Sequence, residues 1–290
     1  MTRRRLPAVP ASTLLAAAAY AAPAASQQAV VTLESSAAAA PMTGRLFVIF
    51  SRAGDREPRL LAGSYGGSVP FYGMDVSAWK PGATATVGAK VLGFPFVDLA
   101  HMPAGDYYAQ ALLNVYTQYH RADGHTIWVH ADQWEGQHWS TSPGNLVSEV
   151  VKVHFDPAAH TTVRLALTKK LPAVEPPADT RWVKHVKMKS ELLSKFWGAP
   201  VYIGATVLLP KDFDASSDRR YPAIYIQGHF GLGAPFGFTE SAVTPARGNG
   251  ARRAGADASV WDPTPSSARE SGHEFAKAWM SDDFPRYVAI

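Results

Sequence analysis

Cysteine is absent from the 290-residue chain. Disulfides, thiolate metal ligands and cysteine nucleophiles are therefore excluded. The chain also lacks an apolar run long enough to cross a membrane, because the stretch near the N-terminus extends only from Ala11 to Ala22. A spanning helix needs about 20 apolar residues, so we expect no stable membrane anchor. Hydrophobic residues make up 47% of the chain and charged residues 18%, which is typical of a folded globular protein.

The N-terminus has the pattern of an export signal. Three arginines, Arg3 to Arg5, precede the apolar stretch, and small residues follow it in Ala22-Pro23-Ala24. A basic start, a short apolar centre and a small-residue cleavage site are typical of a signal peptide. We therefore predict that residues 1–25 are a signal peptide and that the protein is exported, to the periplasm or the cell exterior. The alternative is a disordered alanine-rich tail.

Little basic charge remains without this segment. Residues 1–25 carry three arginines and no acidic side chain, so their removal lowers the formal charge from +4 to +1. Two later arginine pairs, Arg219-Arg220 and Arg252-Arg253, are isolated in loop-like sequence. Nucleic-acid binding needs a clustered basic face, and we expect no nucleic-acid partner.

Composition divides the rest of the chain into four segments. Residues 26–43 are rich in Ala, Ser and Gln and are predicted to form a flexible lead-in. Residues 44–170 carry repeated short strand patterns and are predicted to form an immunoglobulin-like β-sandwich. A proline-rich linker is expected at 171–180. Residues 181–290 then form the second predicted domain.

Alternation of apolar and polar side chains supports the β-sandwich. One predicted strand runs over 107–116, with apolar residues at the odd-numbered positions, and others lie near 151–155 and 163–167. The run from His101 to Tyr107 resembles the tyrosine corner of immunoglobulin-like domains. In that corner a tyrosine hydroxyl hydrogen-bonds back across a glycine turn.

Beyond the linker the pattern changes. Candidate strands lie at 182–188, 201–209 and 221–227, followed by a long loop, a helix at 274–280 and a terminal strand at 286–290. The succession of strand, loop, helix and strand is that of a parallel α/β sheet.

Two stretches of this region carry a family resemblance. Ala205-Thr-Val-Leu-Leu-Pro-Lys-Asp-Phe213 and Arg220-Tyr-Pro-Ala-Ile-Tyr-Ile-Gln-Gly-His-Phe-Gly231 resemble the second and third strands of an α/β-hydrolase esterase family. This family includes esterase D-like, feruloyl esterase-like and enterochelin esterase-like proteins, several of which carry an all-β domain in front. The resemblance covers about residues 181–290. It implies serine-dependent hydrolysis of a small-molecule carboxylic ester, with no cofactor.

The loop after the third strand is the candidate site. In the family this loop usually contains a His-Gly pair and offers a backbone N–H to the oxyanion, whereas here the order is Gly228-His229-Phe230-Gly231. The resemblance therefore implies that Gly228, His229 and Phe230 are oxyanion-hole candidates. Loss of one such donor costs on the order of 3 kcal/mol in other hydrolases. The alternative is that the glycines permit a tight turn and His229 is a solvated loop residue.

The family's nucleophile is missing from the sequence. A Gly-x-Ser-x-Gly elbow should be followed by an acid and a histidine, and no such elbow is present. The nearest approach, Ala62-Gly63-Ser64-Tyr65-Gly66, lies in the predicted β-domain. We therefore expect the chain to be the N-terminal part of a hydrolase, truncated before its nucleophile, with no catalytic residue of its own and no activity as written.

The loop from Gly231 to Arg269 is longer than most connections in compact domains. In an intact hydrolase it would border the substrate, with Phe236, Phe238 and Trp261 as apolar contacts. The alternative is a disordered excursion.

Histidines 120, 125, 130 and 138 invite a metal hypothesis. Spacing by five residues places alternate members on opposite faces of a strand, and no carboxylate cluster brackets them. We predict no metal site.

Aromatic residues are concentrated in the same stretch. Trp128, Trp134 and Trp139, with Tyr116 and Tyr119, could stack on sugar rings or could pack within and between domains. The alternative function is thus a non-enzymatic β-sandwich binding protein, for a glycan or a protein partner, with a degenerate hydrolase-like segment.

Overall fold

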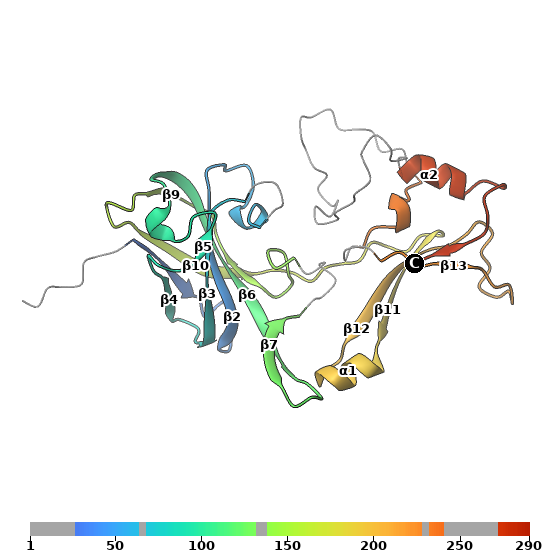
Figure 1. Cartoon of the computed structure of the whole chain (residues 1–290), viewed down its shortest axis with the longest axis horizontal. Coiled ribbons are helices and arrows are strands. Elements are labelled where there is room, and N and C mark those ends of the chain that lie inside the picture. Colours follow the sequence, from blue (N-terminus) through green and yellow to red (C-terminus); the bar gives the residue numbers. More distant parts are fainter. Residues whose placement is uncertain (1–26, 64–67, 132–137, 228–231, 241–271) are drawn as a thin grey trace, which may run out of the picture.

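The protein is mostly β-sheet, with one strongly curled sheet and a second, smaller sheet (Figure 1). We call residues 27–170 the first unit and residues 181–290 the second unit. Residues 171–180 between them form no helix or strand, as expected for a proline-rich linker. The computed structural model describes residues 27–63, 68–131, 138–227, 232–240 and 272–290.

One continuous sheet forms the first unit. Its elements are β1 (Gln28–Leu33), β2 (Met42–Ser51), η1 (Pro58–Leu60), β3 (Phe71–Trp79), β4 (Thr84–Val87), β5 (Gly93–Phe94), η2 (Leu99–His101), β6 (Gly105–His120), β7 (Thr126–His130), β8 (Leu146–Ser148), β9 (Val151–Phe155) and β10 (Thr162–Lys170). The order is β4-β1-β10-β8-β6-β2-β3-β5, and β7 and β9 also pair with β6. The pairing of β1 with β10 is parallel.

Strand β1 corrects the prediction for residues 26–43. The sequence predicts a flexible lead-in there, but β1 and the start of β2 lie within it. That prediction is wrong because Ala29, Val31 and Leu33 alternate inward and are fully buried. This alternation of buried and exposed side chains is sufficient for a half-buried strand. The alanine- and serine-rich composition of the residues after Leu33 obscures it in the sequence.

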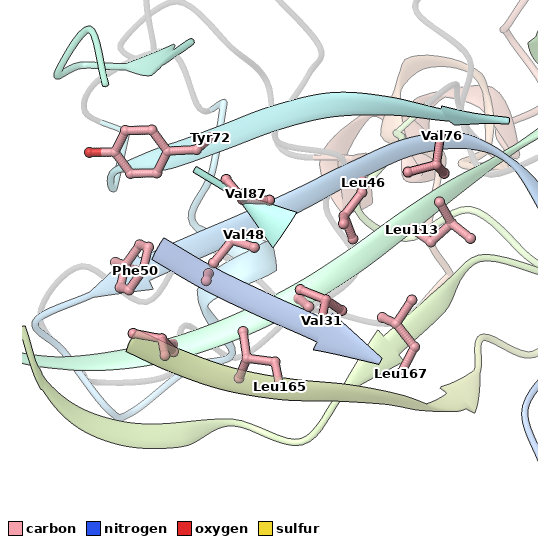
Figure 2. Close-up of a cluster of buried hydrophobic side chains, with 14 of the residues drawn as sticks. Val31, Leu46, Val48, Phe50, Tyr72, Val76, Val87, Leu113, Leu165 and Leu167 are labelled. Carbon is pink, nitrogen blue, oxygen red and sulfur yellow. The ribbon is translucent and has the colours of Figure 1, made fainter. Parts of the chain in front are cut away.

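Figure 2 shows the interior of the curled sheet, where side chains from facing strands meet. The ring of Phe50 lies 6.1 Å from Tyr72, 6.0 Å from Tyr107 and 5.7 Å from Phe155, measured between centroids. Burying a large apolar side chain stabilises a fold by about 1.5–3 kcal/mol. This main core contains 22 buried residues and is the chief stabilising feature of the first unit.

The predicted central strand is β6, and its tyrosine corner is formed. The hydroxyl of Tyr107 donates to the carbonyl of Pro103 over 2.8 Å and accepts from Arg52 Nη2 over 3.0 Å. Tyr107, Ala109, Ala111 and Leu113 are all buried, as the alternation predicts, but Gln110, Leu112 and Asn114 on the other face are buried as well.

The second unit is built on a four-stranded sheet. Its elements are β11 (Val183–Lys189), α1 (Glu191–Trp197), β12 (Tyr202–Leu208), β13 (Ala223–Ile224), η3 (Pro235–Gly237), α2 (Gly272–Trp279) and β14 (Val288–Ala289). The strand order is β11-β12-β14-β13. Strand β12 is antiparallel to both β11 and β14, whereas β13 and β14 are parallel. Helix α2 therefore lies in the connection between two parallel strands.

Helix α1 was not predicted from the sequence. The Ser190 hydroxyl caps its first turn by accepting from the backbone N–H of Leu193, and Gly198 ends it in the left-handed conformation, with φ of +68°. Both are standard helix-ending signals. The helix buries none of its residues fully, because it projects from the end of the β11–β12 pair.

The tip of the β6–β7 hairpin contacts this helix, and we call this the hairpin–helix contact (Figure 1). The N–H of Ala122 donates to the carbonyl of Phe196 over 2.7 Å. The Arg121 guanidinium lies 4.9 Å from the Phe196 ring centroid and 5.8 Å from that of Trp197, and Tyr119 meets Trp197 edge to face at 5.4 Å. Cation–π and aromatic pairs each contribute about 0.5–1.5 kcal/mol, so the two units are joined by more than the linker.

Candidate functional site

The candidate oxyanion loop follows β13. Gly228, His229 and Phe230 lie outside the described residues, but the chain on both sides is held in place. Before the loop, the N–H of Ile226 donates to the carbonyl of Ile290 over 2.6 Å. After it, the carbonyl of Leu232 contacts a side chain from β11. The described residues on either side of the loop are thus bonded to other parts of the second unit.

That side chain is His185, which is only 6% exposed. Its Nε2 lies 3.2 Å from the Leu232 carbonyl oxygen and its Nδ1 lies 3.3 Å from Asp179 Oδ1. Both partners are acceptors, so a hydrogen on either ring nitrogen has an acceptor within reach. The contact ties the last linker residues, β11 and the end of the candidate loop together.

Asp179 is the centre of this arrangement. Its carboxylate also accepts from the backbone N–H of His185 over 2.8 Å, and this bond is the main cause that lowers the pKa of Asp179. The carboxylate therefore stays ionised while it holds the histidine. Sequence reasoning did not single out His185 or Asp179, because an acid and a histidine six residues apart carry no recognisable spacing.

The three predicted substrate contacts have different environments. Phe236 is 47% exposed and has a left-handed backbone, with φ of +56°, and its ring packs 4.8 Å from Phe275. Phe238 is buried, with its ring 6.1 Å from Trp182. Its ring is enclosed in the core of this unit, and its role as a substrate contact in an intact hydrolase stays a prediction. Trp261 lies outside the described residues.

Polar bonds fix the segment that carries Phe236. The indole N–H of Trp182 donates to Glu240 over 2.9 Å, and His273 Nδ1 lies 3.3 Å from the Thr239 carbonyl oxygen. The indole N–H of Trp279 in α2 donates to the Leu209 carbonyl over 2.8 Å. Residues 232–240 are thereby attached to β11 on one side and to α2 on the other.

The histidines of the first unit bond to separate partners. His120 lies 3.0 Å from Thr126, His125 pairs with Asp123, and His130 lies between Asn114 and Ser142. In the part of the chain that the structure describes, no group of three or more potential ligands is placed to hold a metal ion.

The aromatic residues of the β6–β7 region divide between packing and exposure. Trp139 stacks on Phe47 at 4.3 Å, and Tyr119 packs on Trp197 in the other unit. Trp128 is 46% exposed, and Trp134 lies outside the described residues, as does Ser64. Packing thus explains two of these side chains and leaves Trp128 facing solvent.

Among the described helices, none has the length and apolar character needed to cross a membrane. No family model, curated protein or solved structure matches the chain.

Proposed function

We propose that the second unit is the first part of an α/β-hydrolase domain and that the chain is the N-terminal part of an exported serine esterase. The observation that carries the proposal is the strand order β11-β12-β14-β13. In the α/β-hydrolase order the fourth strand of the sheet lies between the second and the third. In this unit the fourth strand, β14, likewise lies between β12 and β13. A helix connects β13 and β14, as in a parallel α/β unit. The order is independent of the sequence resemblance and supports it.

The proposed chemistry is hydrolysis of a small-molecule carboxylic ester without a cofactor. Negative charge develops on the carbonyl oxygen during attack, and backbone donors fixed beforehand stabilise it. Gly228, His229 and Phe230 are the proposed source of one donor. The bonds of Ile226 and Leu232 on either side support this role, because a donor is effective only if its loop does not have to reorganise.

The nucleophile, its acid and its histidine are not supplied by these 290 residues under this proposal, because no Gly-x-Ser-x-Gly elbow is present. The chain by itself should therefore not hydrolyse esters. Sequencing the gene beyond codon 290 tests this directly. The expected result is an in-frame Gly-x-Ser-x-Gly elbow followed by a histidine codon, and a stop codon with no elbow in any frame would contradict it.

The proposed donor is tested in the protein made from the whole gene. Proline has no backbone N–H, so His229→Pro and Phe230→Pro each delete one candidate donor. One of the two variants is expected to lower kcat for p-nitrophenyl acetate by a factor on the order of 10²–10³, with KM little changed. His229→Ala, which keeps the N–H, is the control and should retain most activity. Equal activity in all three variants would remove the N–H groups of His229 and Phe230 from the mechanism and leave Gly228 as the remaining candidate.

A second candidate is a non-enzymatic binding protein built on an immunoglobulin-like first unit. The tyrosine-corner bond of Tyr107 supports that class for the first unit. The exposed face of Trp128 favours binding over packing alone. Export through residues 1–25 is part of both proposals.

A further inference from the structure

One hollow of the first unit has the size and lining of a small-ligand site. It has a volume of about 300 Å³ and lies beside the β6–β7 hairpin. Tyr116 and Trp128 line it, and they lie diagonally across the two strands, since Tyr116 is opposite His130 and Trp128 is opposite Gln118. Diagonal neighbours on one face of an antiparallel pair lie about 7–8 Å apart, within reach of aromatic rings. The hollow is therefore bordered by two aromatic side chains on one face.

A β-bulge between β2 and β3 forms the wall of the hollow opposite Tyr116 and Trp128. Met42 is opposite Trp79 and Gly44 is opposite Val76, so Thr43 alone faces the two residues Ser77 and Ala78. Ala78 has a left-handed backbone, with φ of +45°, which costs a residue other than glycine roughly 1–2 kcal/mol. Bulges re-aim side chains and are common beside binding sites. Here the bulge brings Thr43 and Ser77, two hydroxyl-bearing residues, to the lining of the hollow.

The polar groups of the hollow suit a ligand rich in hydroxyls. The Thr43 oxygen accepts from the N–H of Ala78 over 3.1 Å, and its own hydrogen can donate outward. Asp75 lines the hollow and offers acceptor lone pairs, with Arg45 Nη1 bound to one oxygen at 2.8 Å. Burial and the Asp75 charge raise the pKa of Tyr116, which keeps its hydroxyl protonated.

Charge identifies the class of ligand. Asp75 is the charged residue of the lining, and its carboxylate is paired with the Arg45 guanidinium over 2.8 Å, so the charge at the site is compensated and does not select an ionic ligand. The aromatic faces suit the C–H face of a flat ring, and the hydroxyls and carboxylate suit its rim. These two requirements together describe a pyranose ring without ionised groups.

We propose that this hollow binds one pyranose ring of a neutral oligosaccharide, with Trp128 as the stacking platform. The proposal deepens the binding role of the second candidate function. It holds whether or not the second unit belongs to an esterase, because the hollow lies wholly in the first unit.

Isothermal titration of the whole chain with cellohexaose, xylohexaose and mannohexaose tests the proposal. At least one of them is expected to bind with a Kd of about 1 mM or lower, and Trp128→Ala should weaken that binding at least tenfold. Trp128→Phe keeps an aromatic face and should weaken binding less than Trp128→Ala does. Tyr225→Ala removes a 78% exposed aromatic from the other unit and should leave binding unchanged.

Near-UV circular dichroism verifies that each variant is folded, since Trp128 is too exposed to support the core. Binding should be insensitive to added salt, and hexagalacturonate, an anionic sugar, should not compete. The proposal is wrong if none of the three neutral sugars binds, or if Trp128→Ala binds as the unchanged chain does. Ester hydrolysis is measured separately and is unaffected by either result.

Discussion

At the scale of single residues, Glu57 joins two parts of the first unit. It accepts from Arg59 Nε over 2.8 Å and from Gln110 over 2.7 Å, and Gln110 is almost fully buried in β6. The hydrogen bond from Arg59 is the main cause that lowers the pKa of Glu57 below its ordinary value of 4.5. Glu57 is therefore the carboxylate through which pH acts on the attachment of η1 to the sheet.

We predict a pH-dependent effect for Glu57→Gln. Because the folded-state pKa is lowered, the ionised carboxylate stabilises the fold above the unfolded pKa, and this stabilisation is lost as pH falls through the folded pKa. Its side chain is 43% exposed, so solvent screening reduces the expected loss at about pH 7 to about 1 kcal/mol. Urea unfolding at about pH 7 and about pH 3 should show this difference shrinking at the lower pH.

Glu191→Gln is the matched control for this experiment. Glu191 is 80% exposed and pairs only across the surface with Lys189. Surface pairs contribute about 0–1 kcal/mol, so its substitution should change the unfolding free energy little at either pH. If Glu57→Gln lowered the unfolding free energy equally at both pH values, the packing of the side chain and not its charge would be responsible.

At the scale of elements, the hairpin–helix contact requires glycine where α1 ends. A Cβ at Gly198 would lie 2.3 Å from the His120 carbonyl oxygen, closer than any real contact. Gly198→Ala should therefore separate the hairpin from the helix as well as strain the left-handed backbone. Gly124, with φ of +87°, has open space where its Cβ would be.

The pair of variants isolates the contact. Gly124→Ala should destabilise the chain only by the backbone cost of roughly 1–2 kcal/mol. Gly198→Ala should cost more and should also speed hydrogen exchange at the Ala122 amide, which donates to α1. Equal exchange of that amide in the two variants would contradict a specific hairpin–helix contact.

Elements with a strong local pattern were predictable from the sequence. Alternation located β6, β9 and β10, and a short apolar run indicated β13. Helix α1 was not predicted although Ser190 and Gly198 mark its ends, and the contact of its aromatic side chain with Arg121, about 75 positions earlier, is not visible in the local sequence. Only the aromatic side of the hollow could be anticipated. Its bulge depends on the register between β2 and β3, which the sequence does not display.

At the scale of the whole molecule, the two units differ in how well they are packed. Among the described residues, the main core of the first unit has 22 buried members and the core of the second has seven. Within the described residues, β13 is an edge strand, where the 78% exposed Tyr225 lies between Ile224 and Ile226, which bond to Ile290. Unpaired strand edges promote association between chains.

We predict that residues 27–180 fold by themselves and that residues 181–290 do not. Even with the hairpin in place, α1 and the β11–β12 pair carry a set of partly or largely exposed apolar side chains, and separation from the hairpin would remove the cover of Arg121 from Phe196. The apolar side chains of this set are Val186, Met188, Leu192, Leu193, Phe196, Tyr202 and Ile203, most of which are already more than 36% exposed. Urea unfolding should be cooperative for 27–180, whereas light scattering should show that 181–290 aggregates. A monomeric 181–290 with a sharp unfolding transition would overturn this expectation.

The parallel pairing of β1 with β10 also determines the order in which the chain can fold. The two strands are 134 residues apart in sequence, from Gln28 to Thr162. Contacts between such distant segments form slowly, because a long loop must close first. Strand β1 can pair with β4 once Val87 has been synthesised, but its other edge has no partner until β10 follows. If residues 1–25 direct export, the sheet of the first unit is closed around β1 only after β10 has also crossed.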